Sequence, residues 1–524
     1  MEKIKNISRF WLILLAITVV GIFLRTYNFH DWLRFNADQG RDSELVSNVV
    51  DGKASWPLLG PKAGGTEFKL GGAFYYLEIA SAKIFGNTPD KMAYPDLFSG
   101  ILCIPLLFLF LRKYFDKKTS LLLVTIFAVS NYAIRYARFA WNPNSTPFWT
   151  MLALFAMHEV ICEKNNRKFL WAVICGIAIG IGVQLHTTLL LFLPITTILV
   201  FGYLAIKNIK MLKYFLIILV VSLFLNTPQI YGEYQTGGKN IKAFFGGVSS
   251  KQAAESTLVN NVLHGSSCWI QGNLDIVSGY EISDKCSFKI GSHANDTWAF
   301  LLGTIFVVGG SILGVGYIRR EKNTDKKSFL LLLSVFTSVT FLVFLKLAFE
   351  LSVRFYLILI FLPFFLLGFW FQFLREKFKD KAFYLALVIS LILIFSNLFF
   401  VQKYFSELAK YGKGEGGNMD VTILKEAETF SQFILKNSSD TEKVEIDGDG
   451  KFLFKAYKPI RYLVGRSHLE LTQISKKPPL PAQYFYLGTL KDKEKFSQDA
   501  NVKILKFEDY GSFTILLLQN NKGL

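Results

Sequence analysis

The strongest constraint on the fold of this 524-residue chain is a series of apolar runs. Each is close to the ~20 residues that a helix needs to cross a hydrocarbon layer of ~30 Å. Since 52% of the residues are hydrophobic and only 19% are charged, a soluble globular enzyme, a disordered chain and a disulfide-framework scaffold are excluded. The runs lie at residues 9–26, 95–112, 119–136, 145–162, 168–185, 187–206, 212–230, 297–318, 328–347, 352–374 and 381–401. We therefore expect a polytopic α-helical membrane protein with about eleven transmembrane helices.

The net charge of +18 indicates an orientation in the membrane rather than nucleic-acid binding, because most basic residues gather in short loops between the runs. The clusters lie at 3–9, 112–118, 164–168, 207–213, 319–327 and 375–381. Lysine and arginine mark cytoplasmic loops, so we expect the N-terminus in the cytoplasm and the C-terminal region outside, in a plasma (inner) membrane. The first run could instead be a cleaved signal peptide, but no small-residue cleavage site follows it.

Three regions are too polar to lie in the membrane. We expect a transmembrane domain over residues 1–401 with outer loops at 27–94 and 231–296, and an extracytoplasmic domain over 402–524. Within the first loop, Ser43–Val50 and Ala73–Ile84 are typical of helices that lie along the membrane surface. In the tail, strand-like runs at Lys443–Ile446, Gln483–Leu487 and Phe513–Leu518 and a helical pattern at Val421–Leu435 predict a small α/β domain.

Two cysteines, Cys268 and Cys286, lie in the second outer loop. An oxidising exterior allows a disulfide between them, and two unpaired thiols are equally compatible with the sequence. No cysteine and histidine spacing matches a structural zinc site.

The densest polar cluster runs from Asn36 to Asp42, shortly after the first apolar run. A carboxylate such as Asp38 can act as a general base on an acceptor hydroxyl, and Arg41 can keep it ionised or hold a phosphate. Asp42 is a second carboxylate that could contact substrate. The alternative is that Asp38 caps a helix and that Arg41 and Asp42 form a solvated surface.

A glycine-rich segment follows at Gly64–Gly72 and contains Glu67 and Lys69. Glycines allow backbone to approach a ligand, so Lys69 is a candidate phosphate ligand and Glu67 a candidate substrate contact. A flexible loop with a snorkelling lysine is the alternative.

The loop after the third run combines two arginines with an aromatic and amide-rich turn. Such groups suit an anionic headgroup or the face of a sugar. Ordinary anchoring at the membrane interface would explain the aromatic rings but not the arginines. The candidates are Arg135, Arg138, Trp141, Asn142 and Asn144.

Two further candidates lie at outer hairpins. His186 is more often a hydrogen-bonded packing residue than a site residue at such a position, and Arg354 either pairs with Glu350 or meets a phosphate. All the favoured groups converge on the outer side, and few ionisable residues lie at the middle of a run. That distribution argues against an ion-coupled transporter.

The arrangement resembles the GT-C class of membrane glycosyltransferases, and within it the family-39-like protein O-mannosyltransferases and lipid A aminoarabinose transferases. The residues that carry the resemblance are Asp38 with Arg41, the segment Glu67–Lys69, and the turn Arg138–Asn144. The resemblance implies an inverting transfer from a polyprenyl-phosphate-linked sugar, with Asp38 as the catalytic base and Arg41 and Lys69 at the donor phosphate. Arg138 and Arg354 are added on electrostatic grounds, because cations stabilise a phosphate leaving group.

The sequence departs from the family where Gln39 stands in place of the acidic residue that usually follows the aspartate. The resemblance implies no metal or other cofactor, and it implies as partners the lipid-linked donor, the membrane, and a lipid, glycan or protein acceptor. A flippase or transporter of lipid-linked sugars is the alternative function, and a scaffold that presents the tail to partners is a third.

Overall fold

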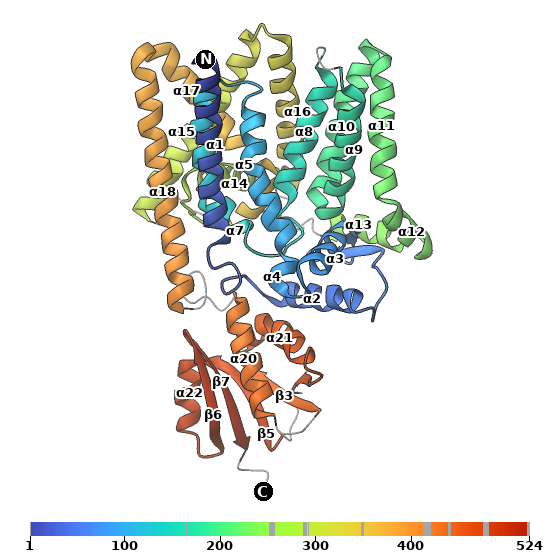
Figure 1. The fold of residues 1–524 in the computed structure, drawn as a ribbon, viewed down its shortest axis with the longest axis vertical. Helices are drawn as coiled ribbons and strands as arrows, with labels where there is room; N and C mark the ends of the chain where they lie inside the picture. The colour runs from blue at the N-terminus through green and yellow to red at the C-terminus, as the bar shows by residue number, and fades with distance from the viewer. Residues whose placement is uncertain are drawn as a thin grey trace.

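The computed structural model describes residues 2–162, 166–250, 257–283, 285–286, 291, 293–346, 351–411, 421–438, 442–474 and 481–520. Long helices form a bundle, and a small domain with a β-sheet lies at one end of it (Figure 1). We call this end of the bundle the tail side and residues 421–520 the tail domain. The start of α1 lies at the opposite end (Figure 1).

The bundle is built from apolar helices joined by short connections. Seven stretches of the described chain are long and apolar enough to cross a membrane, or eight if the bent pair α11–α12 is one span, and one of the seven contains both α17 and α18. The predicted class of polytopic helical membrane protein is therefore confirmed, and the count of eleven is not. The helices are α1 (Glu2–Thr26), α5 (Tyr94–Leu111), α6 (Lys117–Ala128), α7 (Asn131–Tyr136), α8 (Thr146–Ile161), α9 (Lys168–Leu185), α10 (Thr187–Lys207), α11 (Lys210–Leu225), α15 (Ala294–Arg320), α16 (Thr324–Lys346), α17 (Leu362–Phe378) and α18 (Ala382–Tyr411).

Two predicted spans are wrong in detail. The run 119–136 is not one helix, because α6 ends at Ala128 and α7 begins at Asn131. Between them Ser130 is buried and donates its hydroxyl to the carbonyl of Ile276, 2.7 Å away. The run 352–374 begins with the 3₁₀ helix η2 (Val353–Leu359) and becomes α-helical only at Leu362. Hydropathy alone does not register such breaks, since the residues around them stay apolar.

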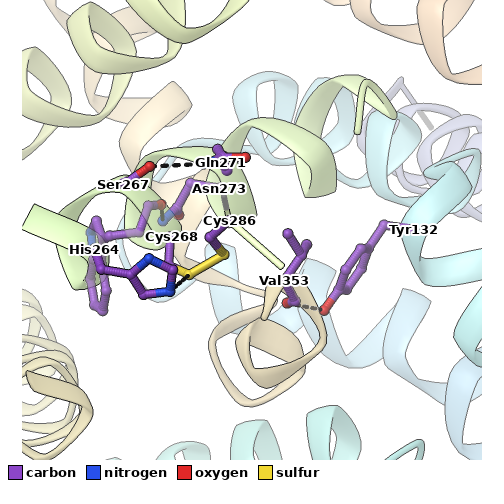
Figure 2. Close-up of a disulfide and its surroundings, with 9 residues drawn as sticks. Tyr132, His264, Ser267, Cys268, Gln271, Asn273, Cys286 and Val353 are labelled. Carbon is purple, nitrogen blue, oxygen red and sulfur yellow. Dashed lines mark hydrogen bonds between the residues drawn. A yellow bond between two sulfur atoms is a disulfide. The ribbon is translucent and has the colours of Figure 1, made fainter. Parts of the chain in front are cut away.

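The segment predicted as the second outer loop is largely helical. It holds α12 (Thr227–Gln235), α13 (Lys239–Ser250) and α14 (Leu258–Ser278), and α14 packs against the 3₁₀ helix η2 and against α15 to α18. The structure pairs Cys268 of α14 with Cys286 in a disulfide, so it selects the first of the two alternatives that the sequence left open (Figure 2). The disulfide ties the middle of α14 to the segment that follows the helix.

The first loop folds along the tail side of the bundle. It consists of α2 (Ala37–Val50), the two-stranded pair β1 (Leu59–Lys62) and β2 (Lys69–Gly71), α3 (Ala73–Phe85) and α4 (Pro89–Met92). The predicted helix at 73–84 is present, and the one predicted at 43–50 begins six residues earlier, at Ala37. Figure 1 shows α2 between the bundle and the tail domain.

The tail domain is an α/β unit, as predicted. Its sheet has the strand order β4-β3-β5-β7-β6, in which β3 is parallel to β4 and β5, and β7 is antiparallel to β5 and β6. The elements are α20 (Leu424–Asn437), β3 (Lys443–Gly448), α21 (Gly450–Gly465), β4 (Glu470–Gln473), β5 (Gln483–Thr489), α22 (Leu490–Ser497), β6 (Val502–Tyr510) and β7 (Phe513–Asn520).

Strand β7, which lies between β5 and β6, is buried on both faces. Phe513 and Ile515 point into a core shared with α20 and α21, whereas Leu516 points to the opposite face, as the two-residue period of a strand requires. The first of these cores continues into the first loop through Phe35 and Val46. The tail domain and α2 therefore share one hydrophobic core.

Basic segments meet at the end of the bundle away from the tail domain. Arg112, Lys326 and Arg375 line one small cavity there, and Arg375 pairs with Asp116 at 3.0 Å. Three of the six predicted cytoplasmic clusters thus lie together. That this side faces the cytoplasm stays a prediction.

Candidate functional site

A cavity of about 1170 Å³ opens between the bundle and the tail domain, and we call it the polar cavity. Six basic side chains of the described residues line it: Arg34, Arg135, Arg354, Lys403, Lys455 and Lys458. Four acidic side chains of the described residues join them: Asp38, Asp275, Glu281 and Glu407. A pocket that gathers so many charges is a candidate site for a charged ligand.

Asp38 lies in the first turn of α2 and does not cap the helix. Asn36 occupies the cap position, and its backbone N–H donates to Oε1 of Gln39 at 3.1 Å. Nε2 of Gln39 donates to the carbonyl of Ala140 at 2.9 Å. A glutamate at position 39 could accept the first bond but could not donate the second. This accounts for the departure from the family pattern and leaves the Asp38 side chain, 61% exposed, directed to the polar cavity.

Arg41 joins Asp38 to a buried carboxylate. Its Nε and Nη2 donate to the two oxygens of Asp42 at 2.9 and 3.0 Å, and its Nη1 donates to Asp38 at 3.1 Å. Tyr75 of α3 donates its hydroxyl to Asp42 at 2.8 Å. A bidentate pair fixes a guanidinium in orientation as well as in position. Arg41 is therefore a rigid bracket for Asp38, and neither Arg41 nor Asp42 lines the polar cavity.

Further carboxylates lie behind this bracket. Glu78 of α3 is buried, and its Oε2 has no hydrogen-bond partner in the described part of the chain. Burial, and next the charges of Asp42 and Asp96, raise the pKa of Glu78 well above its ordinary value. Burial also raises the pKa of Asp42, although Arg41 opposes the shift.

The tail domain bonds to the backbone just before α2 and packs closely against the helix itself. Backbone bonds join Phe35 N–H to the carbonyl of Thr422 at 2.7 Å and Leu424 N–H to the carbonyl of Leu33 at 2.8 Å. At Gly40, a Cβ atom would lie 2.6 Å from the backbone nitrogen of Pro459 and 2.8 Å from the carbonyl carbon of Lys458. Only glycine allows α2 and α21 to approach so closely. The tail domain thus takes part in placing Asp38.

The turn over residues 136–144 forms another part of the wall. The rings of Tyr136 and Phe139 each stack against Trp141. Oδ2 of Asp96 accepts the Trp141 N–H at 2.8 Å, and Asn144 donates to the carbonyl of Phe139 at 2.8 Å. Trp141 lines the polar cavity, whereas Asn142 donates to the carbonyl of Leu185 at 2.5 Å and, like Asn144, lies outside its lining. The two amides hold the turn in shape.

Arg138 lies elsewhere than the prediction of a donor-phosphate ligand requires. It is 1% exposed, and its Nη1 donates to the carbonyl of Arg25 at 2.9 Å at the end of α1. Cations suit helix C-termini because carbonyls there lack partners within the helix. Its guanidinium also lies over the rings of Phe29 and Phe405. Arg138 thus packs the end of α1 and does not line the polar cavity.

Arg135 and Arg354 do line it. Arg135 pairs with Glu281 at 2.8 Å. The guanidinium of Arg354 lies 5.7 Å from the ring centroid of Trp141, and no carboxylate of the described residues pairs with it. Glu350, the alternative partner of Arg354, falls outside the described residues.

His186 and Glu67 have local partners. Nδ1 of His186 accepts the Thr188 N–H at 3.3 Å at the start of α10, so this histidine caps a helix. Glu67 pairs with Lys62 at 2.6 Å and is exposed. Neither lines the polar cavity.

A second cavity, of about 990 Å³, lies between α9, α10, α11, α12 and α13, and we call it the apolar cavity. Its wall is made mainly by aliphatic and phenyl side chains such as Ile179, Leu219 and Phe244. Lys69 lies beside this cavity, because its backbone N–H donates to Asn240 at 2.7 Å and both Phe68 and Asn240 line the cavity. The side chain of Lys69 is exposed. Lys69 does not line the polar cavity.

The structure therefore brings four of the predicted residues together in the polar cavity: Asp38, Arg135, Trp141 and Arg354. Arg41 reaches the site through its bond to Asp38. Sequence reasoning missed Arg34, Lys403, Lys455 and Lys458. The spacing of Lys455 and Lys458 on one helical face was a visible signal, but nothing local placed that helix beside α2.

In the part of the chain that the structure describes, no three His, Cys, Asp or Glu side chains gather as they would to hold a metal ion. The absence of a metal or other cofactor from the reaction stays a prediction.

A family model described as dolichyl-phosphate-mannose-protein mannosyltransferase matches residues 73–231. A comparison with curated proteins finds no match. Among solved structures, the apo oligosaccharyltransferase of Archaeoglobus fulgidus is 14% identical with a TM-score of 0.48 over 88% of this chain, and the chain covers 64% of that enzyme's length. ArnT from Cupriavidus metallidurans is 12% identical with a TM-score of 0.45 over 99% of this chain and 98% of its own.

The S. cerevisiae protein O-mannosyltransferase Pmt1-Pmt2 complex is 14% identical with a TM-score of 0.33 over 44% of this chain and 34% of its own. The stretch that matches the family model begins at α3 and ends within α12, so it includes the turn at 136–144 and helices α9 to α11. The family match confirms that this chain is similar to membrane glycosyltransferases, as the resemblance in sequence predicted.

Proposed function

We propose that the protein moves a monosaccharide from a polyprenyl-phosphate-linked donor to an acceptor hydroxyl, with inversion, on the tail side of the membrane. One observation carries the proposal: Asp38 reaches into a large cavity rich in cations and aromatic rings, held by a bracket of Arg41 and Asp42. The description of the matched family names dolichyl-phosphate mannose, a lipid-phosphate-linked sugar, which supports a lipid-linked donor here.

The proposed step needs one base and one anion site. Asp38 removes the proton of the acceptor hydroxyl while its oxygen forms a bond to the anomeric carbon of the sugar. The bond from that carbon to the phosphate oxygen breaks, and polyprenyl phosphate leaves with the electron pair. Arg354 lines the polar cavity beside Trp141, and its guanidinium would stabilise the charge that develops on the phosphate.

The apolar cavity would hold part of the lipid chain. Its wall offers apolar surface to a chain that loses little by leaving the bilayer, and Lys69 at its edge can meet the phosphate to which the chain is attached. Strand β2 and the end of α9 would then lie between the lipid chain in the apolar cavity and the sugar in the polar cavity. Gly71 permits this packing, since a Cβ there would lie 2.3 Å from Cγ of Gln184.

We also propose that the tail side faces outward from the plasma membrane, because the basic clusters gather at the other end. A cysteine in place of the exposed Ser497, in a variant without the three unpaired cysteines, should react with an impermeant maleimide on intact cells. Labelling that requires permeabilised cells would reverse the orientation.

The decisive experiment replaces Asp38 by asparagine, which keeps the shape and removes the base. In proteoliposomes supplied with a panel of polyprenyl-phosphate hexoses and pentoses, release of polyprenyl phosphate should fall by about 10³-fold, because general bases contribute ~10²–10⁴. Asp31→Asn is the matched control, since Asp31 lies outside the polar cavity. A D38N protein that releases polyprenyl phosphate at the wild-type rate contradicts the proposal. Movement of the intact lipid-linked sugar without such release would indicate a transporter instead.

A further inference from the structure

One wall of the polar cavity belongs to the tail domain. Helix α21 contributes Phe454, Lys455, Tyr457 and Lys458, and the end of β4 contributes Gln473. The opposite face of α21, with Phe452, packs into the core of the tail domain. The helix is thus amphipathic, and its polar face is turned to the cavity.

Three lysines on two helices line the polar cavity. Lys455 and Lys458 are three residues apart and therefore lie on one face of α21, and Lys403 of α18 lines the same cavity. None of the three forms an ion pair with a carboxylate of the described residues. By contrast Arg461, one turn further along α21, pairs with Glu44 at 2.5 Å.

An aromatic ring lies beside these charges. Phe454 is 70% exposed although it borders a cavity, and the Nζ of Lys455 lies 5.6 Å from the centroid of its ring. On α7 and the turn after it, Tyr136 and Trp141 add stacked rings to the lining. Flat apolar faces flanked by cations and amides fit a sugar ring that carries a negative charge.

The wall is fixed relative to Asp38. Gly40, two residues after Asp38, approaches the backbone of Lys458 so closely that a Cβ would meet it at 2.8 Å. Ser47 and Tyr462 hydrogen bond at 2.8 Å, and Arg466 pairs with Asp51 at 2.8 Å. A ligand held by Lys455 and Lys458 is therefore held close to the carboxylate of Asp38.

From this arrangement we infer that α21 and α18 form the acceptor subsite, and that the acceptor is a saccharide bearing a phosphate or carboxylate group. The anionic group binds Lys455, Lys458 and Lys403, the ring packs on Phe454, and a hydroxyl of the same molecule is presented to Asp38. The inference rests on the proposed function for its chemistry, but its binding step can be measured without donor.

The test uses the full chain in nanodiscs and calorimetric titration with mannose 6-phosphate, mannose and inorganic phosphate, in the absence of donor. Mannose 6-phosphate should bind more tightly than either of the others. In K455Q/K458Q its affinity should fall by roughly 100-fold, because each of the two lost charged hydrogen bonds costs about a factor of ten. The matched control is K451Q/K503Q, which removes the same charge from exposed lysines outside the cavity and should bind as the wild type does.

A second experiment distinguishes an anionic saccharide in solution from one that is carried by a membrane lipid. Vesicles that carry a glucuronic-acid glycolipid are titrated in parallel, and binding there but not to mannose 6-phosphate assigns the acceptor to the membrane, provided that K455Q/K458Q weakens it. Phe454→Ala should weaken both ligands.

Binding by K455Q/K458Q that equals the wild type, or equal affinity for mannose and its phosphate with no binding of the glycolipid vesicles, overturns the inference. In D38N the binding should persist. If D38N still binds the anionic saccharide but transfers no sugar, the acceptor subsite stands. If the lysine variants bind as the wild type does, the subsite is wrong but the proposed sugar transfer is not contradicted.

Discussion

The polar cavity is lined by ten charged side chains of the described residues, whereas Glu233 is the one charged side chain among the described residues that line the apolar cavity. The two are similar in size, at about 1170 and 990 Å³. A ligand that fills both cavities must be amphiphilic, with a charged head and a long apolar chain. A charged group without partners is costly in the apolar cavity, and an apolar chain gains little in the polar cavity.

The cavities also differ in how the chain builds them. The apolar cavity draws on neighbouring segments between residues 179 and 245, with Phe68 added from the first loop. The polar cavity draws on segments from Arg34 to Gln473, and the tail domain closes it. The apolar cavity is thus a product of adjacent helices, and the polar cavity depends on contacts between distant parts of the chain. The variants below test this contrast in order of expected effect.

Asp42→Asn should have the largest effect of these variants, and it should act on the polar cavity alone. The amide cannot accept both bonds from Arg41, so the bracket loosens and Asp38 moves. We expect the turnover number to fall about 100-fold, since a displacement of ~1 Å can cost that much, with the KM for donor unchanged. In the wild type, turnover should fall at a higher pH than for an ordinary aspartate, because burial raises the pKa of Asp42 and acid breaks the pair.

Steady-state kinetics over pH 4 to 8 provide the measurement for Asp42. Asp42→Glu, which can restore the pair, should recover part of the turnover. An unchanged turnover number in D42N, or a change in donor KM alone, would show that the pair of Arg41 and Asp42 does not position Asp38 for the reaction.

Glu78→Gln, near the polar cavity, should change the pH dependence of the free energy of unfolding. The folded protein holds the Glu78 proton above the pH at which the unfolded chain loses it, since burial and the charges of Asp42 and Asp96 raise its pKa. The free energy of unfolding therefore decreases as pH rises from about 4.5 through that raised pKa. Glutamine needs no proton, so the variant should be more stable than the wild type at pH 8 by about 1–2 kcal/mol, and the difference should shrink at pH 5.

Thermal unfolding in detergent at the two pH values measures the effect of Glu78→Gln. The control is Glu233→Gln at the apolar cavity, whose carboxylate accepts the Ile241 N–H on the protein surface. It should not alter the pH dependence. A variant E78Q that is less stable than the wild type at pH 8 would show that the buried carboxylate is stabilising.

Leu219→Trp should have a smaller effect, confined to the apolar cavity. The indole occupies space that the lipid chain would fill, so the KM for a long-chain donor should rise about fivefold, as the loss of ~1 kcal/mol of apolar contact predicts, with turnover unchanged. Leu216→Trp on the same helix is the matched control, because Leu216 is exposed outside the cavity. With a donor whose chain is two isoprene units long, L219W and the wild type should agree. A fivefold change that persists with the short donor would place the lipid chain elsewhere.

Much of the scaffold followed from the sequence. Apolar runs predicted the bundle, short strand-like runs predicted strands β3, β5 and β7, and the surface helix at 73–84 was expected. The breaks near Ser130 and before Leu362 were not foreseen, because a polar residue buried against a neighbouring helix leaves hydropathy almost unchanged.

At the site, the sequence singled out Asp38 and Arg41 because two carboxylates and a cation lie close together in the chain. It predicted Arg138 as a ligand of the donor phosphate, whereas in the structure this side chain donates to a carbonyl at the end of α1, more than 100 residues away. It also attached no role to Lys455 and Lys458, since their importance depends on the approach of α21 to Gly40.

The sequence by itself determined that this chain crosses a membrane repeatedly, and local spacing determined which helices and strands form, because hydropathy and periodicity are properties of neighbouring residues. Only the tertiary structure decided that the tail domain closes the polar cavity and that Tyr75 of α3 holds the carboxylate of Asp42. Those contacts join residues separated by tens to hundreds of positions, and their energies depend on distance and burial that no local pattern encodes.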